Sequence, residues 1–223
     1  MSRASEMRWA VGLGSAALSL LASWAAYGIE GAYLSAAVLA FHELGHAVVM
    51  RRLGYEVVGI VFVPFLCGLT VGVKANATPR ESVAAWLAGP APGIALALVL
   101  LALGVDREPL GRVLIHMLIV VNLLNLLPLW PLDGGRVAML LLRSASERAI
   151  KLVTFSSIAG LVALGLVLSA PWLFVVAALA FGTRRYNVAM GDAADANETA
   201  VLFLGYALCI SGGFIGLGLV YRG

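Results

Sequence analysis

Charged residues are scarce in this sequence. They make up 12% of its 223 residues against 61% for hydrophobic ones, and the mean hydropathy is +0.97. A soluble globular domain is nearer half apolar and a quarter charged. Because one small water-soluble core cannot bury this excess, the composition excludes an ordinary soluble domain and indicates a protein that uses the lipid bilayer as its solvent. We expect a single integral membrane domain over residues 1–223.

Cysteine is nearly absent, and basic residues are few. Cys67 and Cys209 are the two cysteines, and they lack the paired spacing that a disulfide framework or a cysteine zinc site needs. The net charge is +3, without a basic stretch interleaved with aromatic residues. We therefore expect no nucleic-acid partner, and the sequence leaves the oligomeric state open.

Long apolar runs, by contrast, are abundant. A helix needs about 20 apolar residues to cross the hydrocarbon core. Six runs meet or approach this length: Trp9–Tyr27, Tyr33–Met50, Val83–Leu103, Gly111–Trp130, Ile150–Ser169 and Ala200–Val220. A seventh run, Pro171–Gly182, is short and spans only with help from its flanks, and Asp192–Glu198 is expected to be a solvated loop. The sequence predicts an all-α polytopic membrane protein with six or seven transmembrane helices, those within 150–220 being accessory.

The distribution of Lys and Arg predicts the orientation. With seven spans and a cytoplasmic N-terminus, 12 of the 15 basic residues lie inside, and only Arg107, Arg112 and Arg222 lie outside. Six spans move Arg184 and Arg185 outside without changing the sign of the bias. Since Lys and Arg accumulate in cytoplasmic loops, we expect a cytoplasmic N-terminus and active-site side, in the plasma (inner) membrane of a prokaryote.

One apolar segment does not read as a spanning helix. Tyr55–Val73 is rich in β-branched residues and is interrupted by Pro64 and Gly68, which favours a β-hairpin or short sheet. Bare strand edges are costly in lipid, so we expect this insert to be membrane-associated, at the interface or against protein. It offers a strand edge that can hold an unwound substrate extended.

The chemistry is concentrated in His42-Glu43-Leu44-Gly45-His46, an HExxH motif inside an apolar run. Positions i and i+4 share one helix face, so both imidazoles reach one metal ion, and Glu43 is placed to act as the base. Ionisable groups at membrane depth are costly and usually functional. A purely structural, hydrogen-bonded helix contact is the weaker alternative.

Catalytic zinc usually has three protein ligands, and the sequence offers two candidates for the third. His116 is expected near the opposite end of its span from the motif. Asp133 is expected on the same side, after a segment broken by Pro128 and Pro131. Taken alone, Asp133 reads equally well as a turn residue, but the unfilled ligand position favours it.

The HELGH motif within a membrane helix, followed by Asn125-Leu-Leu-Pro-Leu-Trp-Pro-Leu-Asp133-Gly-Gly, resembles the site-2 protease family of intramembrane metalloproteases. The resemblance covers a catalytic core of about residues 33–136, with the β-rich insert at 55–73. It implies one Zn²⁺ per chain held by His42, His46 and Asp133, with Glu43 as catalytic base. It also implies a transmembrane protein as substrate, cleaved within or beside the membrane.

The sequence departs from the family at one motif. The family often has G-P-x-x-N at the start of its third core helix, whereas this chain has Gly89-Pro90-Ala91-Pro92-Gly93. Glycine at 93 means that any role of that asparagine is absent or has moved elsewhere. Asn125 is a candidate hydrogen-bond donor to the substrate backbone or to the oxyanion, and helix packing is an equal alternative for it. Packing is the favoured interpretation of Asn122.

Two other functions compete with this one. A prenyl-protein protease would take its third ligand from a glutamate in a later span, and no later glutamate lies in a predicted span with an E-x-x-x-D pattern. A non-proteolytic transporter or scaffold with a metal site would also use broken helices and buried acids. Against the second alternative, the acids expected at membrane depth, Glu43 and Asp133, both belong to the hydrolase pattern.

Overall fold

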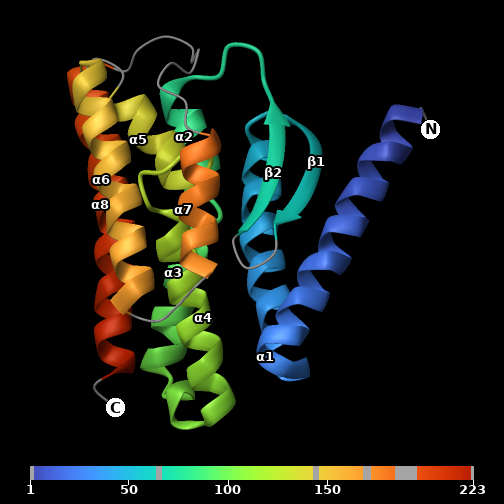
Figure 1. Ribbon diagram of the computed structural model, residues 1–223. Helices are drawn as coiled ribbons and strands as arrows, with labels where there is room; N and C mark the ends of the chain where they lie inside the picture. The colour runs from blue at the N-terminus through green and yellow to red at the C-terminus, as the bar shows by residue number, and fades with distance from the viewer. Residues whose placement is uncertain (1–2, 64–66, 143–145, 168–171, 184–194, 222–223) are drawn as a thin grey trace. The chain divides into compact units, whose positions relative to one another are not determined.

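The computed structural model describes residues 3–63, 67–142, 146–167, 172–183 and 195–221, most of them helical (Figure 1). In chain order the elements are α1 (Arg3–Arg52), β1 (Glu56–Val63), β2 (Cys67–Val73), α2 (Pro79–Leu87), α3 (Pro90–Ala102), the 3₁₀ turn η1 (Val105–Arg107), α4 (Pro109–Asn125), α5 (Asp133–Leu141), α6 (Glu147–Val167), α7 (Trp172–Thr183) and α8 (Ala196–Val220).

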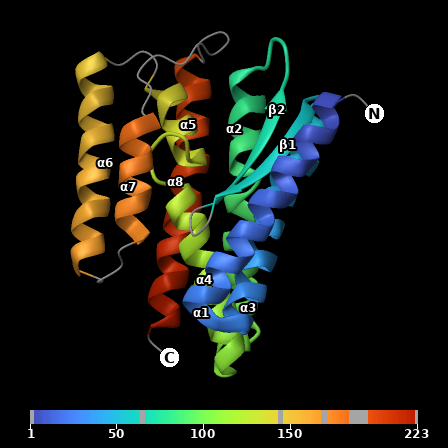
Figure 2. The same ribbon diagram turned by 45° about the vertical axis from the view of Figure 1, so that its right-hand side comes forward.

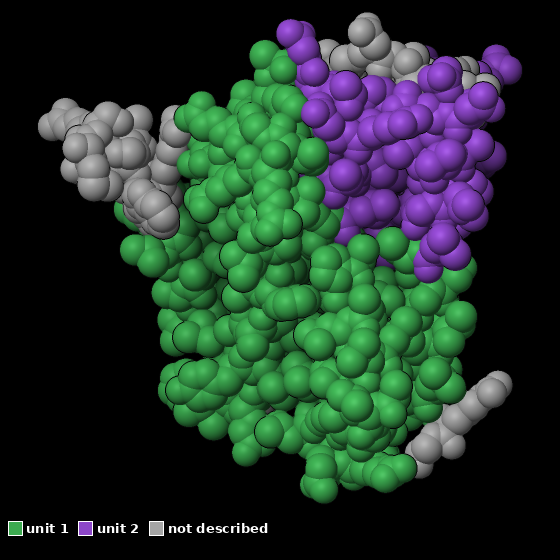
Figure 3. Space-filling model, turned by 180° about the vertical axis from the view of Figure 1, so that it is seen from behind, with its two compact units in different colours: residues 1–75, 88–123, 209–223 green, residues 76–87, 124–208 purple. Residues whose placement is uncertain are grey.

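Packing divides the chain into two compact units, which Figure 3 shows in different colours. The first unit comprises residues 1–75, 88–123 and 209–223, so it holds α1, the hairpin, α3, most of α4 and the end of α8. The second comprises residues 76–87 and 124–208, with α2, α5, α6, α7 and the start of α8.

In the first unit, α1 runs through both of the first two predicted spans. Its arms meet at Gly28, where φ is +71°. Glycine adopts this left-handed conformation without the steric cost that a Cβ brings. The two apolar runs are therefore joined by a sharp kink with no intervening loop.

The β-rich insert forms the predicted hairpin, in which β1 and β2 pair antiparallel with an irregularity between Val57 and Gly59. It lies beside the first arm of α1 (Figure 2). The Phe62 N–H donates a 3.0 Å hydrogen bond to Ser15 Oγ on that arm. The outer edge of β1 is thus partly covered by protein, as the cost of a bare edge in lipid requires.

A small apolar core holds the helices of the first unit together. Its buried members come from α1, α3, α4 and the end of α8: Val38, Ala97, Ile115, Leu118, Ile119 and Val220. Glycine permits close approach on the same helices, since a Cβ at Gly45 would overlap the Ala88 carbonyl. This packing fixes the second arm of α1, which carries the HExxH motif.

In the second unit, the proline-broken segment after α4 folds back onto the start of α5. A Cβ at Gly134 would overlap the Leu126 backbone, and one at Gly135 would overlap the Leu129 backbone. The Tyr206 hydroxyl donates a hydrogen bond to the Leu126 carbonyl. The two glycines that follow Asp133 are therefore required by the close approach of this segment.

Among the described residues, two helices are long and apolar enough to cross a membrane, Gly28–Arg52 and Asn197–Val220. The pair α2 and α3, bent by 43°, makes a third if it forms one span. The apolar helices Ala10–Ala25, Pro109–Asn125 and Leu173–Gly182 are shorter. A mainly helical membrane protein with a small sheet is confirmed, whereas the number of six or seven spans stays a prediction.

The boundaries of several predicted elements differ from the structure. The run Val83–Leu103 is broken between Leu87 and Pro90, because proline has no N–H to continue the helix. The run Gly111–Trp130 stops being helical at Asn125, ahead of Pro128. The end of Ile150–Ser169 lies outside the described residues.

The loop predicted at Asp192–Glu198 is wrong at its end. Helix α8 already begins at Ala196, and residues 192–194 lie outside the described part of the chain. The Asp195 carboxylate accepts a 2.6 Å hydrogen bond from the Glu198 N–H. Asp195 is thus an N-cap, which satisfies one of the free amides at the start of the helix.

Candidate metal centre

The two histidines of the motif lie one turn apart on the second arm of α1, and both side chains are buried. Their Nε2 atoms are 3.1 Å apart. Two nitrogen ligands at about 2.0–2.1 Å from a tetrahedral zinc ion lie roughly 3.3 Å apart. The predicted pair of imidazoles is therefore spaced as one metal ion requires.

The orientation of His42 is set by Asn122 on α4. The Asn122 Nδ2 donates a 2.6 Å hydrogen bond to the Leu118 carbonyl, which turns Oδ1 towards His42. His42 Nδ1 lies 2.7 Å from that oxygen. Because an amide oxygen only accepts, Nδ1 must carry the proton, and the lone pair of Nε2 is left for a metal ion. Asn122, predicted to be a packing residue, is thus a direct partner of a predicted ligand.

Glu43 is 1% exposed, and its carboxylate is held by the hairpin. Thr70 on β2 donates a hydrogen bond of 2.5 Å to Oε2. The other oxygen, Oε1, lies 3.9 Å from His42 Nε2. One carboxylate oxygen is thus anchored to the strand while the other faces the imidazole nitrogens.

Two glycines make room for these side chains. A Cβ at Gly68 on β2 would overlap the Glu43 side chain. A Cβ at Gly89, just before α3, would overlap His46 Nε2 and lie 2.7 Å from His42 Nε2. Gly89 therefore forms an open cradle beside the Nε2 atoms of the two predicted ligands, and any side chain at this position would fill it.

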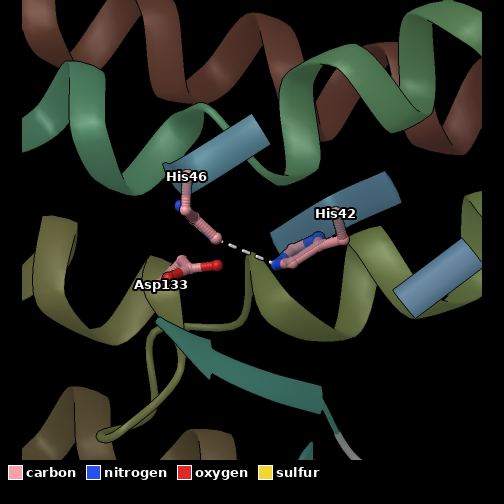
Figure 4. A group of neighbouring side chains, drawn as sticks. All are labelled: His42, His46 and Asp133. Atoms are coloured by element: carbon pink, nitrogen blue, oxygen red, sulfur yellow. Dashed lines mark hydrogen bonds between the residues drawn. The ribbon is translucent and has the colours of Figure 1, made fainter. Parts of the chain in front are cut away.

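Asp133 is the first residue of α5 and is buried. His42, His46 and Asp133 each offer one ligand atom, and these atoms lie within 4.8 Å of one another (Figure 4). Two imidazoles and a carboxylate form a donor set typical of catalytic zinc. This possible metal site is made of the three residues that the sequence predicted as ligands.

The sequence named two further candidates, His116 and Asn125. His116 is half-buried, and its ring meets the edge of the Tyr221 ring at a centroid distance of 5.8 Å. It is not in the metal-competent group found among the described residues. Asn125, the last residue of α4, is buried.

Sequence reasoning missed Thr70 and the use of Asn122. Both are polar residues in otherwise apolar segments, which is the signal that was available. Gly68 was noted as an interruption of the β-rich segment and Gly89 as the start of a motif, but the close approach of both to the HExxH motif was not predicted.

The fold is that of a site-2 protease. The structure matches the site-2 protease from Methanocaldococcus jannaschii with a TM-score of 0.56, over 76% of this chain and 83% of that one, at 19% sequence identity. The resemblance inferred from the HELGH and NLLPLWPLDGG motifs is therefore confirmed.

The sequence is also similar to several curated proteins. "Putative zinc metalloprotease Rip3" of Mycobacterium tuberculosis is 39% identical over 119 residues, which are 49% of this chain and 30% of that protein. "Putative zinc metalloprotease sll0528" of Synechocystis is 38% identical over 49% of this chain and 30% of its own. "Stage IV sporulation protein FB" of Bacillus subtilis is 30% identical over 47% and 37%. The match thus spans about a third of each relative, and no family model matches the chain.

Proposed function

We propose that this protein is an intramembrane zinc metalloendopeptidase of the site-2 type, which cleaves a transmembrane protein within or beside the membrane. The observation that carries the proposal is the buried group of His42, His46 and Asp133 next to the Glu43 carboxylate. The zinc metalloprotease names of its relatives and the site-2 protease fold support it.

His42, His46 and Asp133 would hold one zinc ion per chain. The spacing of the two Nε2 atoms, the open cradle at Gly89 and the donor set all fit the ion. When bound, zinc lowers the pKa of a coordinated water and polarises a carbonyl group.

Glu43 is the proposed catalytic base. Thr70 holds Oε2, and Oε1, 3.9 Å from His42 Nε2, is the proposed acceptor of the proton of the attacking water, which it would then deliver to the leaving amine. Burial keeps competing solvent away from the carboxylate and strengthens its electrostatic effect. Asn125 is a proposed hydrogen-bond donor to the substrate backbone, supported by its place in the NLLPLWPLDGG motif and by its burial.

A transmembrane substrate must unwind before its peptide bonds can be attacked, because helical hydrogen bonds occupy its backbone. We propose that the hairpin receives the unwound chain as an added strand. Ser15 of α1 already binds the outer edge of β1 at Phe62, so β2 is the favoured strand. The same strand contributes Thr70 and Gly68 to the surroundings of Glu43, which would bring the substrate next to the base.

The membrane setting follows from the apolar helices, and the finer location is part of the proposal. We infer a plasma membrane protein with a cytoplasmic N-terminus and active-site side, from the excess of Lys and Arg on that side. The alternative of a transporter or scaffold with a metal site is not favoured, since the relatives are named metalloproteases.

The test compares wild type with Glu43→Gln in detergent micelles. Zinc is measured by mass spectrometry, and cleavage is measured on a set of fluorogenic single-span peptides. We expect both proteins to retain zinc, and the variant to cleave about 10²–10⁴-fold more slowly because it lacks the base. A wild type without zinc, or a variant that cleaves at the wild-type rate, would contradict the proposal.

A further inference from the structure

We propose that Asn122 is a positioning residue that presents His42 to the metal ion, and that residue 93 is glycine so that the Asn122 amide has room. This inference rests on the proposed metal site. It adds a residue that acts on a ligand rather than on the substrate.

The Asn122 side chain is used at both ends. Its Nδ2 is bound to the Leu118 carbonyl on the preceding turn of α4, and its Oδ1 is bound to His42 Nδ1. Asn122 is 0% exposed and His42 is 1% exposed, so water does not compete for either group. The amide can satisfy Leu118 only in the orientation that also receives the imidazole proton.

This contact crosses from α4 to α1, between residues that are 80 positions apart. A histidine ligand with a fixed partner on its second nitrogen has one tautomer and one ring orientation. Without that partner, the neutral His42 ring can adopt the other tautomer, with the proton on Nε2, the atom that faces His46. Loss of such an outer partner typically lowers metal affinity 10–100-fold.

Gly93 on α3 completes the arrangement. A Cβ placed there would overlap Asn122 Nδ2, and it would lie 2.7 Å from Cγ and 2.9 Å from Oδ1. Any side chain at 93 therefore competes with the Asn122 amide for one space. This explains glycine at the position where the family pattern often has asparagine: here the amide enters the space from α4 instead of α3.

The first experiment measures zinc affinity by competition with a chelator in the purified, detergent-solubilised chain. Asn122→Leu keeps the side-chain size but removes the acceptor, and we expect it to bind zinc 10–100-fold more weakly than wild type. Asn122→Asp keeps an oxygen acceptor and should stay within a few-fold of wild type. If the leucine variant binds zinc as tightly as wild type, or if aspartate is no better than leucine, the positioning role is wrong.

Thermal unfolding without and with zinc separates positioning from packing. We expect zinc-free Asn122→Leu to unfold at a lower temperature than wild type, because the buried His42 N–H loses its acceptor. The positioning role predicts in addition that a fixed excess of zinc raises the unfolding temperature of Asn122→Leu by less than that of wild type and of Asn122→Asp, since stabilisation by a ligand follows its affinity. An equal zinc-induced rise in all three proteins would show that Asn122 only packs.

The second experiment exchanges the two positions. Gly93→Asn alone and Asn122→Gly alone should each weaken zinc binding, the first by collision and the second by loss of the acceptor. The double variant Gly93→Asn/Asn122→Gly should bind zinc at least several-fold more tightly than either single variant. If it does not, residues 93 and 122 do not share one space. A wild type that binds no zinc would instead overturn the proposed function, which separates the two failures.

Discussion

The Thr70 hydroxyl donates its hydrogen bond to Oε2 of Glu43, across 27 residues of sequence and from a strand to a helix. Both residues are buried. The hairpin is therefore part of the surroundings of the proposed base, in addition to its proposed role in receiving a substrate strand. A residue that holds one carboxylate oxygen determines where the other one points.

Replacing Thr70 by valine keeps the β-branched shape and removes the donor. Hydrogen bonds to charged groups contribute about 1.5–3 kcal/mol, and tenfold in rate corresponds to about 1.4 kcal/mol. We therefore expect kcat to fall roughly 10–100-fold while zinc content stays at the wild-type level. Thr70→Ser keeps the hydroxyl and should retain most of the activity. Equal kcat values for the valine and serine variants would remove Thr70 from the site.

Replacing Gly89 by alanine should displace the metal ion. The new Cβ would overlap His46 Nε2 and press on His42 Nε2, so at least one imidazole must move. We expect zinc content and cleavage to fall together. Gly14→Ala is the matched control, because a Cβ there meets nothing within 4 Å. The control should keep both zinc and activity. If Gly89→Ala binds as much zinc as wild type, the space at Gly89 is not needed for the proposed metal ion.

Replacing Asp133 by alanine removes the proposed third ligand. We expect zinc affinity to fall and cleavage to be lost, with the helices intact by circular dichroism. Asp133 is also the first residue of α5, where an acidic side chain stabilises the helix, so a modest loss of thermal stability should accompany the loss of zinc. Asp106→Ala changes an acid outside the metal-competent group and is the control. Unchanged zinc affinity in Asp133→Ala would mean that the third ligand has been misassigned.

Much of the site could be predicted because its signals are local. His42 and His46 share a face by helical periodicity alone, and the β-branched composition of Tyr55–Val73 predicted the hairpin. Asp133 was predicted because zinc needs a third ligand, and the motif that contains it resembles a known family. The ends of the spans were predicted less well, since hydropathy does not show where a proline ends a helix. The helices α2, which ends before Pro90, and α4, which ends at Asn125, are the two examples.

The sequence by itself determined which residues are expected to carry the proposed chemistry, because a metal-binding pattern on one helix and an apolar composition need no tertiary information to be recognised. Only the tertiary structure decided which other polar residues contact them. Asn122 reaches His42 across 80 residues and Thr70 reaches Glu43 across 27. Such partners are chosen by helix and strand packing in space, where glycines such as Gly68 and Gly93 allow close approach, and no sequence periodicity records that proximity.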